Sequence, residues 1–108
     1  MTTNPGEIWL ADIPFTDRKA SKIRPVLVLW LDGLDSIVAV VTSAGPRNLT
    51  DVPLTDWKAS GLRKPSTVRL SHIDCLESSL LFHRTGVLTA ADAQRVKDAW
   101  DHHVKPSF

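Results

Sequence analysis

Short apolar segments, separated by turns rich in glycine, proline and aspartate, occupy most of the chain, a pattern typical of a mostly β domain. The pattern predicts strands at 7–13, 24–31, 36–43, 49–54, 66–73 and 80–88. Segment 24–31 is apolar at consecutive positions, so we expect a strand that is buried on both faces. Segment 49–54 is expected at a sheet edge, because Pro53 cannot donate a hydrogen bond to a neighbouring strand.

The end of the chain predicts one amphipathic helix. Thr89 is a good N-cap residue, and an acid follows three positions later at Asp92. Apolar side chains then recur at helical spacing up to Pro106, at Ala93, Val96, Trp100 and Val104. Trp30 and Trp100 are both expected to pack in the core.

A short helical turn is expected over 55–61, with Thr55 or Asp56 as its cap and Gly61 as its stop. Five or six short strands and one terminal helix indicate a mainly β (α+β) fold, either a small curled sheet or a barrel. The length of 108 residues is below that of two domains, so residues 1–108 are expected to form one domain.

Composition excludes several classes of protein. Apolar residues make up 43% and charged residues 23%, which fits neither a disordered nor a fibrous chain. The longest apolar run, at 26–31, is too short for a membrane helix, and the N-terminus has no charged-then-apolar leader. Cys75 is the only cysteine, so an internal disulfide and a cysteine-rich zinc site are excluded. We expect a cytoplasmic protein, with Cys75 buried as a small apolar side chain.

Positive charge is concentrated in two segments, although the net charge is only +1. Segments 18–24 and 57–73 carry four cations each and no acid: Arg18, Lys19, Lys22 and Arg24 in the first, and Lys58, Arg63, Lys64 and Arg69 in the second. Solvated loops are the simplest interpretation of such segments. Binding of phosphate groups is the alternative, and it depends on where the fold places them.

A hairpin brings one of these cations close to an alcohol. The Asp32-Gly33 turn is typical of a hairpin that joins 24–31 to 36–43. A three-residue loop pairs Arg24 with Thr42, and a four-residue loop pairs it with Ser43. Directly opposed side chains lie about 4.5–5.5 Å apart, so a guanidinium and a hydroxyl become neighbours in either register.

Six motifs follow one another along the chain: Gly6-Glu7-Ile8-Trp9-Leu10-Ala11-Asp12-Ile13-Pro14-Phe15, Arg24-Pro25-Val26-Leu27-Val28-Leu29, Thr42-Ser43, Lys64-Pro65-Ser66-Thr67-Val68-Arg69, His72-Ile73-Asp74 and Thr85-Gly86-Val87-Leu88-Thr89. In this order they resemble the MazF/PemK family of toxin-antitoxin ribonucleases. Each motif is weak alone, but their order and spacing are fairly specific, and they span nearly the whole chain.

The resemblance implies an SH3-like β-barrel of the CcdB/MazF type, a homodimer, and metal-independent, sequence-selective cleavage of single-stranded RNA. It also implies an acidic antitoxin partner and no cofactor. Arg24 and Thr42 match the family's catalytic Arg and Thr. The remaining RNA-binding candidates are Asp17, Arg18, Lys19, Lys22, Ser43, Arg69 and His72. The loop before Arg24 departs from many relatives, with Asp17 as its sole acid, which predicts a different cleavage preference or weaker activity.

The chemistry expected for this pair uses the 2′-hydroxyl of the RNA as the nucleophile. Arg24 would stabilise charge on the phosphate and Thr42 would orient the reacting groups. Neither side chain is a natural base, so the group that removes the 2′-hydroxyl proton stays open. Two other functions also stay open: a noncatalytic toxin of the same fold that binds a protein such as DNA gyrase, and an inactive domain that only binds nucleic acid.

Overall fold

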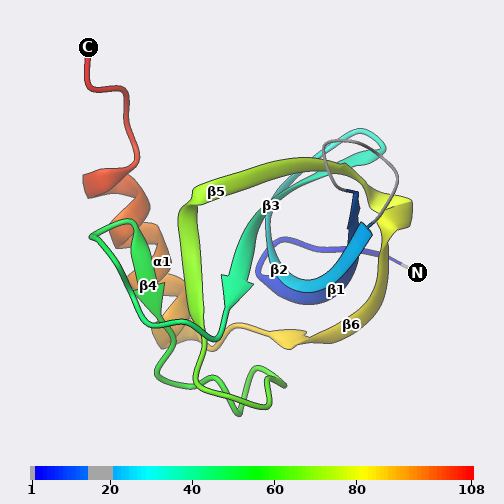
Figure 1. Cartoon of the computed structure of the whole chain (residues 1–108), viewed down its shortest axis with the longest axis horizontal. Coiled ribbons are helices and arrows are strands. Elements are labelled where there is room, and N and C mark those ends of the chain that lie inside the picture. The colour runs from blue at the N-terminus through cyan, green and yellow to red at the C-terminus, as the bar shows by residue number, and fades with distance from the viewer. Residues whose placement is uncertain (1, 15–20) are drawn as a thin grey trace.

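The computed structural model describes residues 2–14 and 21–108, which form a six-stranded antiparallel sheet and a C-terminal helix (Figure 1). The strands are β1 (Glu7–Pro14), β2 (Ser21–Asp32), β3 (Asp35–Thr42), β4 (Asp51–Pro53), β5 (Thr67–Glu77) and β6 (Leu81–Val87). A short 3₁₀ helix, η1 (Ser78–Leu80), precedes β6, and helix α1 spans Ala90–His103. The expected mainly β (α+β) class is confirmed.

The sheet is strongly curled and its strand order is β4-β5-β3-β2-β1-β6. Figure 1 shows β1 and β2 curving around one side while the long strand β5 bends sharply. That bend coincides with a register shift, because Ala39 of β3 pairs with Ile73 whereas Val40 pairs with Arg69. Within the described residues no ladder joins β4 to β6, so the predicted barrel is an open curled sheet.

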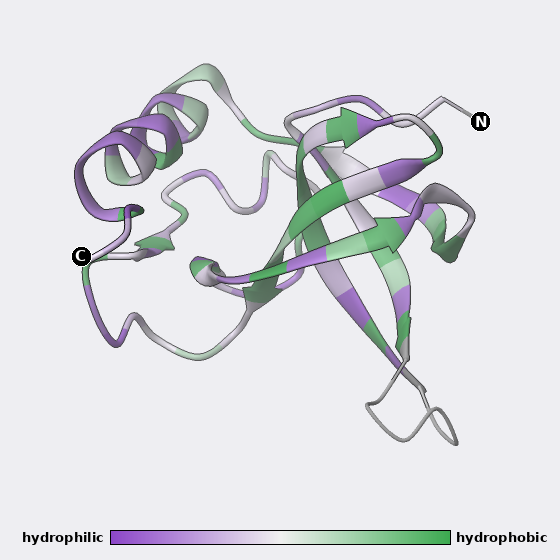
Figure 2. Cartoon of the chain, turned by 90° about the horizontal axis from the view of Figure 1, so that it is seen from above, coloured by the Kyte–Doolittle hydropathy of each residue, from purple (hydrophilic) through white to green (hydrophobic). Residues whose placement is uncertain are grey.

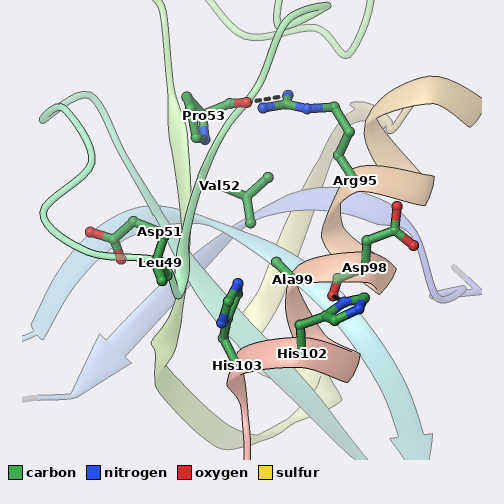
Figure 3. A pocket seen from close by; sticks show the side chains of 9 residues that line it. All are labelled: Leu49, Asp51, Val52, Pro53, Arg95, Asp98, Ala99, His102 and His103. Carbon is green, nitrogen blue, oxygen red and sulfur yellow. Dashed lines mark hydrogen bonds between the residues drawn. The ribbon is translucent and has the colours of Figure 1, made fainter.

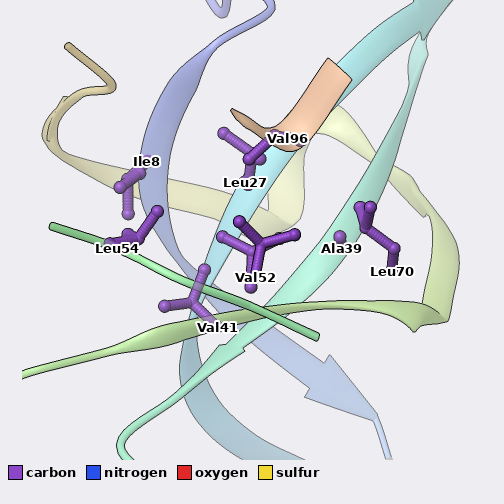
Figure 4. Packing of buried hydrophobic residues seen from close by; sticks show 9 residues of the cluster. Ile8, Leu27, Ala39, Val41, Val52, Leu54, Leu70 and Val96 are labelled. Atoms are coloured by element: carbon purple, nitrogen blue, oxygen red, sulfur yellow. The ribbon is translucent and has the colours of Figure 1, made fainter. Parts of the chain in front are cut away.

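Buried apolar side chains alternate between the two faces of the sheet, as the two-residue period of a strand requires. The cluster drawn in Figure 4 includes side chains of the strands and of helix α1: Ile8, Leu27, Ala39, Val41, Val52, Leu54, Val68, Leu70 and Val96. The cluster on the other face comprises Trp9, Ala11, Val26, Val28, Val38, Leu76 and Leu81. Figure 2 shows the hydrophobic colour concentrated in the strands, whereas the helix is mostly hydrophilic.

Two expectations about burial are wrong. Segment 24–31 is buried on both faces only in its middle, since Trp30 is 45% exposed and Leu31 is 43% exposed. Trp30 instead packs edge-on against Trp100 of α1, with 5.8 Å between the ring centres. Cys75 is also exposed, because it lies on the outward face of β5 beyond the bend. In the described part of the chain, no helix has the length and apolarity needed to span a bilayer.

Helix α1 begins as expected, but its first acid has another role. Thr89 is the N-cap, and its hydroxyl accepts a hydrogen bond from the Asp92 N–H at 3.3 Å. The fully buried Asp92 carboxylate turns away from Thr89 and accepts from the N–H groups of Thr55 (3.1 Å) and Asp56 (2.8 Å) and from Arg95 (3.2 Å). Burial alone would raise the pKa of Asp92, but these hydrogen bonds outweigh it and lower that pKa. The carboxylate therefore ties the helix to segment 55–61.

Segment 55–61 makes one α-turn rather than a helix, with the Ser60 N–H donating to the carbonyl of Asp56 at 3.1 Å. Gly61 ends the turn at φ +86°. A Cβ on Gly61 would lie 2.1 Å from the Thr85 carbonyl oxygen, and a Cβ on Gly86 would lie 2.1 Å from the Ser60 carbonyl oxygen. The turn and β6 therefore touch backbone to backbone, which only glycine permits at both positions.

Glu7 holds the N-terminal segment to β1 and β6 through a buried carboxylate. It accepts hydrogen bonds from the Asn4 N–H (2.7 Å), the Trp9 indole (3.1 Å) and the Arg84 Nε (2.6 Å). Burial alone would raise the pKa of Glu7, but the three donors together lower it below its ordinary value of 4.5. The unfolded chain therefore binds this proton at a higher pH than the folded chain does.

From this difference we expect the free energy of unfolding to fall as the pH drops below 4.5, the ordinary pKa of a glutamate. A Glu7→Gln variant should be less stable than the wild type near neutral pH and should lose less stability on acidification. Urea unfolding between about pH 7 and pH 3 measures this. Glu77→Gln, an exposed position on β5, is the control, and an equal pH dependence in both variants would refute the role of Glu7.

Candidate functional site

The β2–β3 hairpin aligns Arg24 with Thr42 through a shift in register. Next to the turn, Leu31 pairs with Ser36, a register that would align Arg24 with Ser43. An irregularity between Val28 and Trp30 moves the register by one, so that Val26 pairs with Val40. Arg24 lies two residues before Val26 and Thr42 two residues after Val40. The ladder between β2 and β3 ends at Val26 and Val40, and its register extended by two further positions would set Arg24 opposite Thr42.

The two strands take separate partners beyond this point. Arg24 pairs with Ala11 of β1, whereas Thr42 pairs with Thr67 of β5. A pocket of about 280 Å³ opens between the strand ends. Its lining comes from the start of β2, the end of β3 and the segment before β5: Lys22, Ile23, Arg24, Pro25, Val41, Thr42, Ser43, Leu62, Arg63, Lys64 and Ser66.

The pocket is strongly cationic. Among the described residues that line it, none is an aspartate or glutamate and four carry a positive charge: Lys22, Arg24, Arg63 and Lys64. Among residues 2–14 and 21–108, no carboxylate lies within 4 Å of any of these four charged groups. The two acid-free segments of the sequence thus meet at one place, which favours the binding of anions.

The Thr42 hydroxyl is held in a defined orientation beside Arg24. Its oxygen accepts a hydrogen bond from the Ala44 N–H at 3.2 Å. This bond uses one lone pair of the oxygen and leaves the hydroxyl proton available for a hydrogen bond to an anion. The half-buried guanidinium of Arg24 supplies further donors in a fixed planar fork, which matches the oxygens of a phosphate. The pair can therefore bind two oxygens of one phosphate group.

The third wall of the pocket was not identified from the sequence. The sequence placed Arg63 and Lys64 in a cationic segment, and Lys64 also in a motif that resembles the family, but no pairing rule connected either residue to β2. In the structure the N–H of Leu62 donates to the Trp57 carbonyl at 3.0 Å, and the Ser66 hydroxyl donates to the Lys64 carbonyl at 2.8 Å. These bonds fix the backbone on both sides of the two cations.

Several predicted RNA-binding residues do not line this pocket. Arg69 is a residue of β5 that pairs with β3 on one side and β4 on the other, and its Nε is 3.5 Å from the buried carboxylate of Asp51. His72 is exposed at the bend of β5, with its Nε2 3.7 Å from Asp74. Both side chains thus face an acid rather than the pocket. Three further predicted residues lie outside the described residues: Asp17, Arg18 and Lys19.

A second pocket, of about 320 Å³, lies between β4 and α1 (Figure 3). Arg95 crosses one end of it to the Pro53 carbonyl, and His102 Nδ1 lies 2.7 Å from the Asp98 carbonyl oxygen. These contacts serve the fold, so this pocket is a weaker candidate for a binding site. Within the described ranges, no group of three or more His, Cys, Asp and Glu side chains is arranged to hold a metal ion.

Comparison with known proteins gives a consistent result. Residues 4–103 match the family model of the PemK-like, MazF-like toxins of type II toxin-antitoxin systems. No curated protein sequence matches the chain.

Solved structures resemble the chain in fold. An endoribonuclease from a mycobacterial species aligns with a TM-score of 0.75 and 16% identity, covering 100% of this chain and 97% of that one. The same enzyme type in complex with its cognate antitoxin aligns with a TM-score of 0.75 and 16% identity over 97% of this chain and 98% of that one. MazF from Deinococcus radiodurans aligns with a TM-score of 0.69 and 21% identity, covering 92% of this chain and 93% of that one.

Proposed function

Because the chain belongs to the PemK-like, MazF-like family of type II toxins, we propose that it is an endoribonuclease that cleaves single-stranded RNA at selected sequences without a metal ion. The observation that carries this proposal is the cationic pocket that Arg24, near the start of β2, and Thr42, at the end of β3, line together, with no acid among its described lining residues. An RNA backbone presents a row of phosphates, and this pocket offers matching cations and hydroxyls.

The cleavage chemistry follows from these two side chains. The 2′-oxygen of the substrate attacks the adjacent phosphorus, forming the P–O2′ bond while the P–O5′ bond breaks. The products are a 2′,3′-cyclic phosphate and a 5′-hydroxyl, with the 2′-proton lost to a base and one proton gained by the leaving oxygen. Arg24 stabilises the negative charge that grows on the nonbridging oxygens. Thr42 donates a hydrogen bond from its hydroxyl to one of these oxygens and holds the phosphate in line for attack.

The cationic pocket and the family resemblance together indicate which proteins this chain binds. We propose one toxin domain over residues 1–108, a homodimer and a cytoplasmic location, as in the family that the sequence motifs resemble. An acidic antitoxin segment placed at the pocket would neutralise Lys22 and Arg24 and exclude RNA by competing for the same cations. The structural likeness to an endoribonuclease in complex with its cognate antitoxin supports this pairing.

We expect Thr42→Ala to lower kcat by roughly 10- to 100-fold, because one hydrogen bond to a charged oxygen is lost in the transition state. Thr42→Ser retains the hydroxyl that accepts from Ala44 and should stay within about threefold of the wild type. Single-turnover cleavage of a labelled RNA measures both. Equal losses in the two variants would show that the methyl group, rather than the hydroxyl, matters at this position.

The test of the function itself is incubation of the purified protein with a long single-stranded RNA in the presence of a chelator. Discrete cleavage fragments are expected. A parallel assay with DNA gyrase and plasmid DNA covers the noncatalytic alternative. Intact RNA together with gyrase trapped on DNA would reject the proposal in favour of a gyrase-binding toxin, and RNA binding without any product would indicate an inactive domain.

A further inference from the structure

We propose that Arg63 and Lys64, on the segment that precedes β5, bind the phosphate next to the scissile one and so determine how the RNA lies in the pocket. This inference rests on the proposed ribonuclease function and extends it to residues that the catalytic pair does not include. The two side chains line the same pocket as Arg24 and Thr42 but come from a different part of the chain.

The number of charges in the pocket indicates more than one bound phosphate. Each phosphodiester carries one negative charge, whereas Lys22, Arg24, Arg63 and Lys64 bring four positive charges to the pocket. Lys22, Arg63 and Lys64 are exposed, so solvent weakens the repulsion among them, but one phosphate neutralises only part of this positive charge. Two or more phosphates of one strand balance it better.

The size of the pocket agrees with this conclusion. A volume of about 280 Å³ is the space of roughly nine liquid water molecules. A phosphate group has only five heavy atoms. The pocket therefore has room for the scissile phosphate together with part of a neighbouring nucleotide. Arg63 and Lys64 line it from the segment before β5, whereas Arg24 and Thr42 line it from β2 and β3.

Backbone contacts on both sides of the two cations hold the segment that carries them in the structure without RNA. Gly61 packs against the backbone of Thr85 at a distance that excludes any side chain. On the other side of the cations, the Leu54 N–H donates to the Ser66 carbonyl at 2.8 Å. Asp92 of α1 secures the start of the segment through Thr55 and Asp56. Binding at a preformed wall avoids the entropic cost of ordering a loop.

A contact with phosphates predicts a specific change in kinetics. Phosphate contacts position the substrate and carry no sequence information, so their loss affects binding rather than the choice of cleavage site. For the double variant Arg63→Ala/Lys64→Ala we expect about a tenfold rise in KM with kcat within about twofold of the wild type. The salt dependence of log(kcat/KM) should become shallower by roughly 0.7 for each lost contact, the value for single-stranded nucleic acid.

The matched control is Lys58→Ala/Lys105→Ala, which removes the same charge at exposed positions outside the pocket. Lys58 lies 5.4 Å from the centre of the Trp57 ring. The control should retain the wild-type KM and salt slope, and circular dichroism should show that both double variants are folded. Cleavage sites mapped on one long RNA should be the same in all three proteins.

Three outcomes would overturn the inference. Equal changes in KM and salt slope for both double variants would mean that Arg63 and Lys64 act only through net charge. A fall in kcat at unchanged KM would place them at the reacting phosphate. A changed set of cleavage sites would mean that they contact bases. Complete absence of cleavage by the wild-type protein is a distinct result, because it rejects the proposed function on which the inference rests.

Discussion

Replacing Arg24 with alanine should reduce the rate of RNA cleavage by about a thousandfold or more while the protein stays folded. Arg24 is the cation near the start of β2 that lines the same pocket as Thr42. The nonbridging oxygens of the phosphate carry more negative charge in the transition state than in the substrate. A fixed guanidinium therefore stabilises the transition state more than the bound substrate. Its loss therefore lowers kcat more than it raises KM.

One further variant separates charge from geometry at position 24, and a second provides a control at another arginine. Arg24→Lys retains the charge but loses the planar fork, so we expect it to recover only part of the activity. Arg47→Ala removes an exposed arginine of the β3–β4 loop that does not line the pocket, and it should leave the rate unchanged. Cleavage by a folded Arg24→Ala protein at the rate of Arg47→Ala would contradict the catalytic assignment. Single-turnover assays at saturating protein give the comparison.

Replacing Asp92 with alanine should lower the free energy of unfolding by about 3 kcal/mol, the largest stability effect we expect from a single side chain. The change leaves the N–H groups of Thr55 and Asp56 without their acceptor and removes the partner of Arg95. A hydrogen bond to a charged group contributes about 1.5–3 kcal/mol, and the two backbone hydrogen bonds to the Asp92 carboxylate are lost. The melting temperature should fall by roughly 12–24 °C for a domain of this size.

The control for this variant is Asp98→Ala on the same helix. Asp98 is exposed, and its carboxylate accepts one hydrogen bond from Gln94 at 2.9 Å. Its removal should change the free energy of unfolding by less than about 0.5 kcal/mol. Thermal and urea unfolding of the two variants measure the difference. Similar stability of both would show that the contact between α1 and segment 55–61 contributes little.

Local patterns were sufficient to predict the parts of the fold that local interactions determine. The recurrence of Val96 and Trp100 predicted the helix, and Thr89 was correctly predicted as its N-cap. Pro53 placed β4 at the sheet edge, where it lies. The Asp32-Gly33 turn predicted the hairpin, from which the neighbourhood of Arg24 and Thr42 followed. Each of these inferences depends on residues close in sequence.

The features that escaped prediction depend on contacts between distant segments. The register shift near Trp30 has no local sequence signature, so the choice between Thr42 and Ser43 stayed open until the structure was known. Asp92 had the pattern of a capping acid but binds segment 55–61, 36 or more residues away in sequence. Lys64 reaches the pocket only because β5 pairs with β3. Hydrophobic periodicity carries no information on such pairings.

The most direct test of the account is the chemical identity of the fragment ends that the wild-type protein produces from single-stranded RNA in the presence of a chelator. Attack by the 2′-oxygen at a phosphate held by Arg24 and Thr42 predicts upstream fragments that end in a 2′,3′-cyclic phosphate or its hydrolysed phosphate, and downstream fragments that begin with a 5′-hydroxyl. Mass spectrometry of the products distinguishes these ends. Fragments with a 5′-phosphate and a 3′-hydroxyl, or RNA left intact by the folded protein, would contradict it.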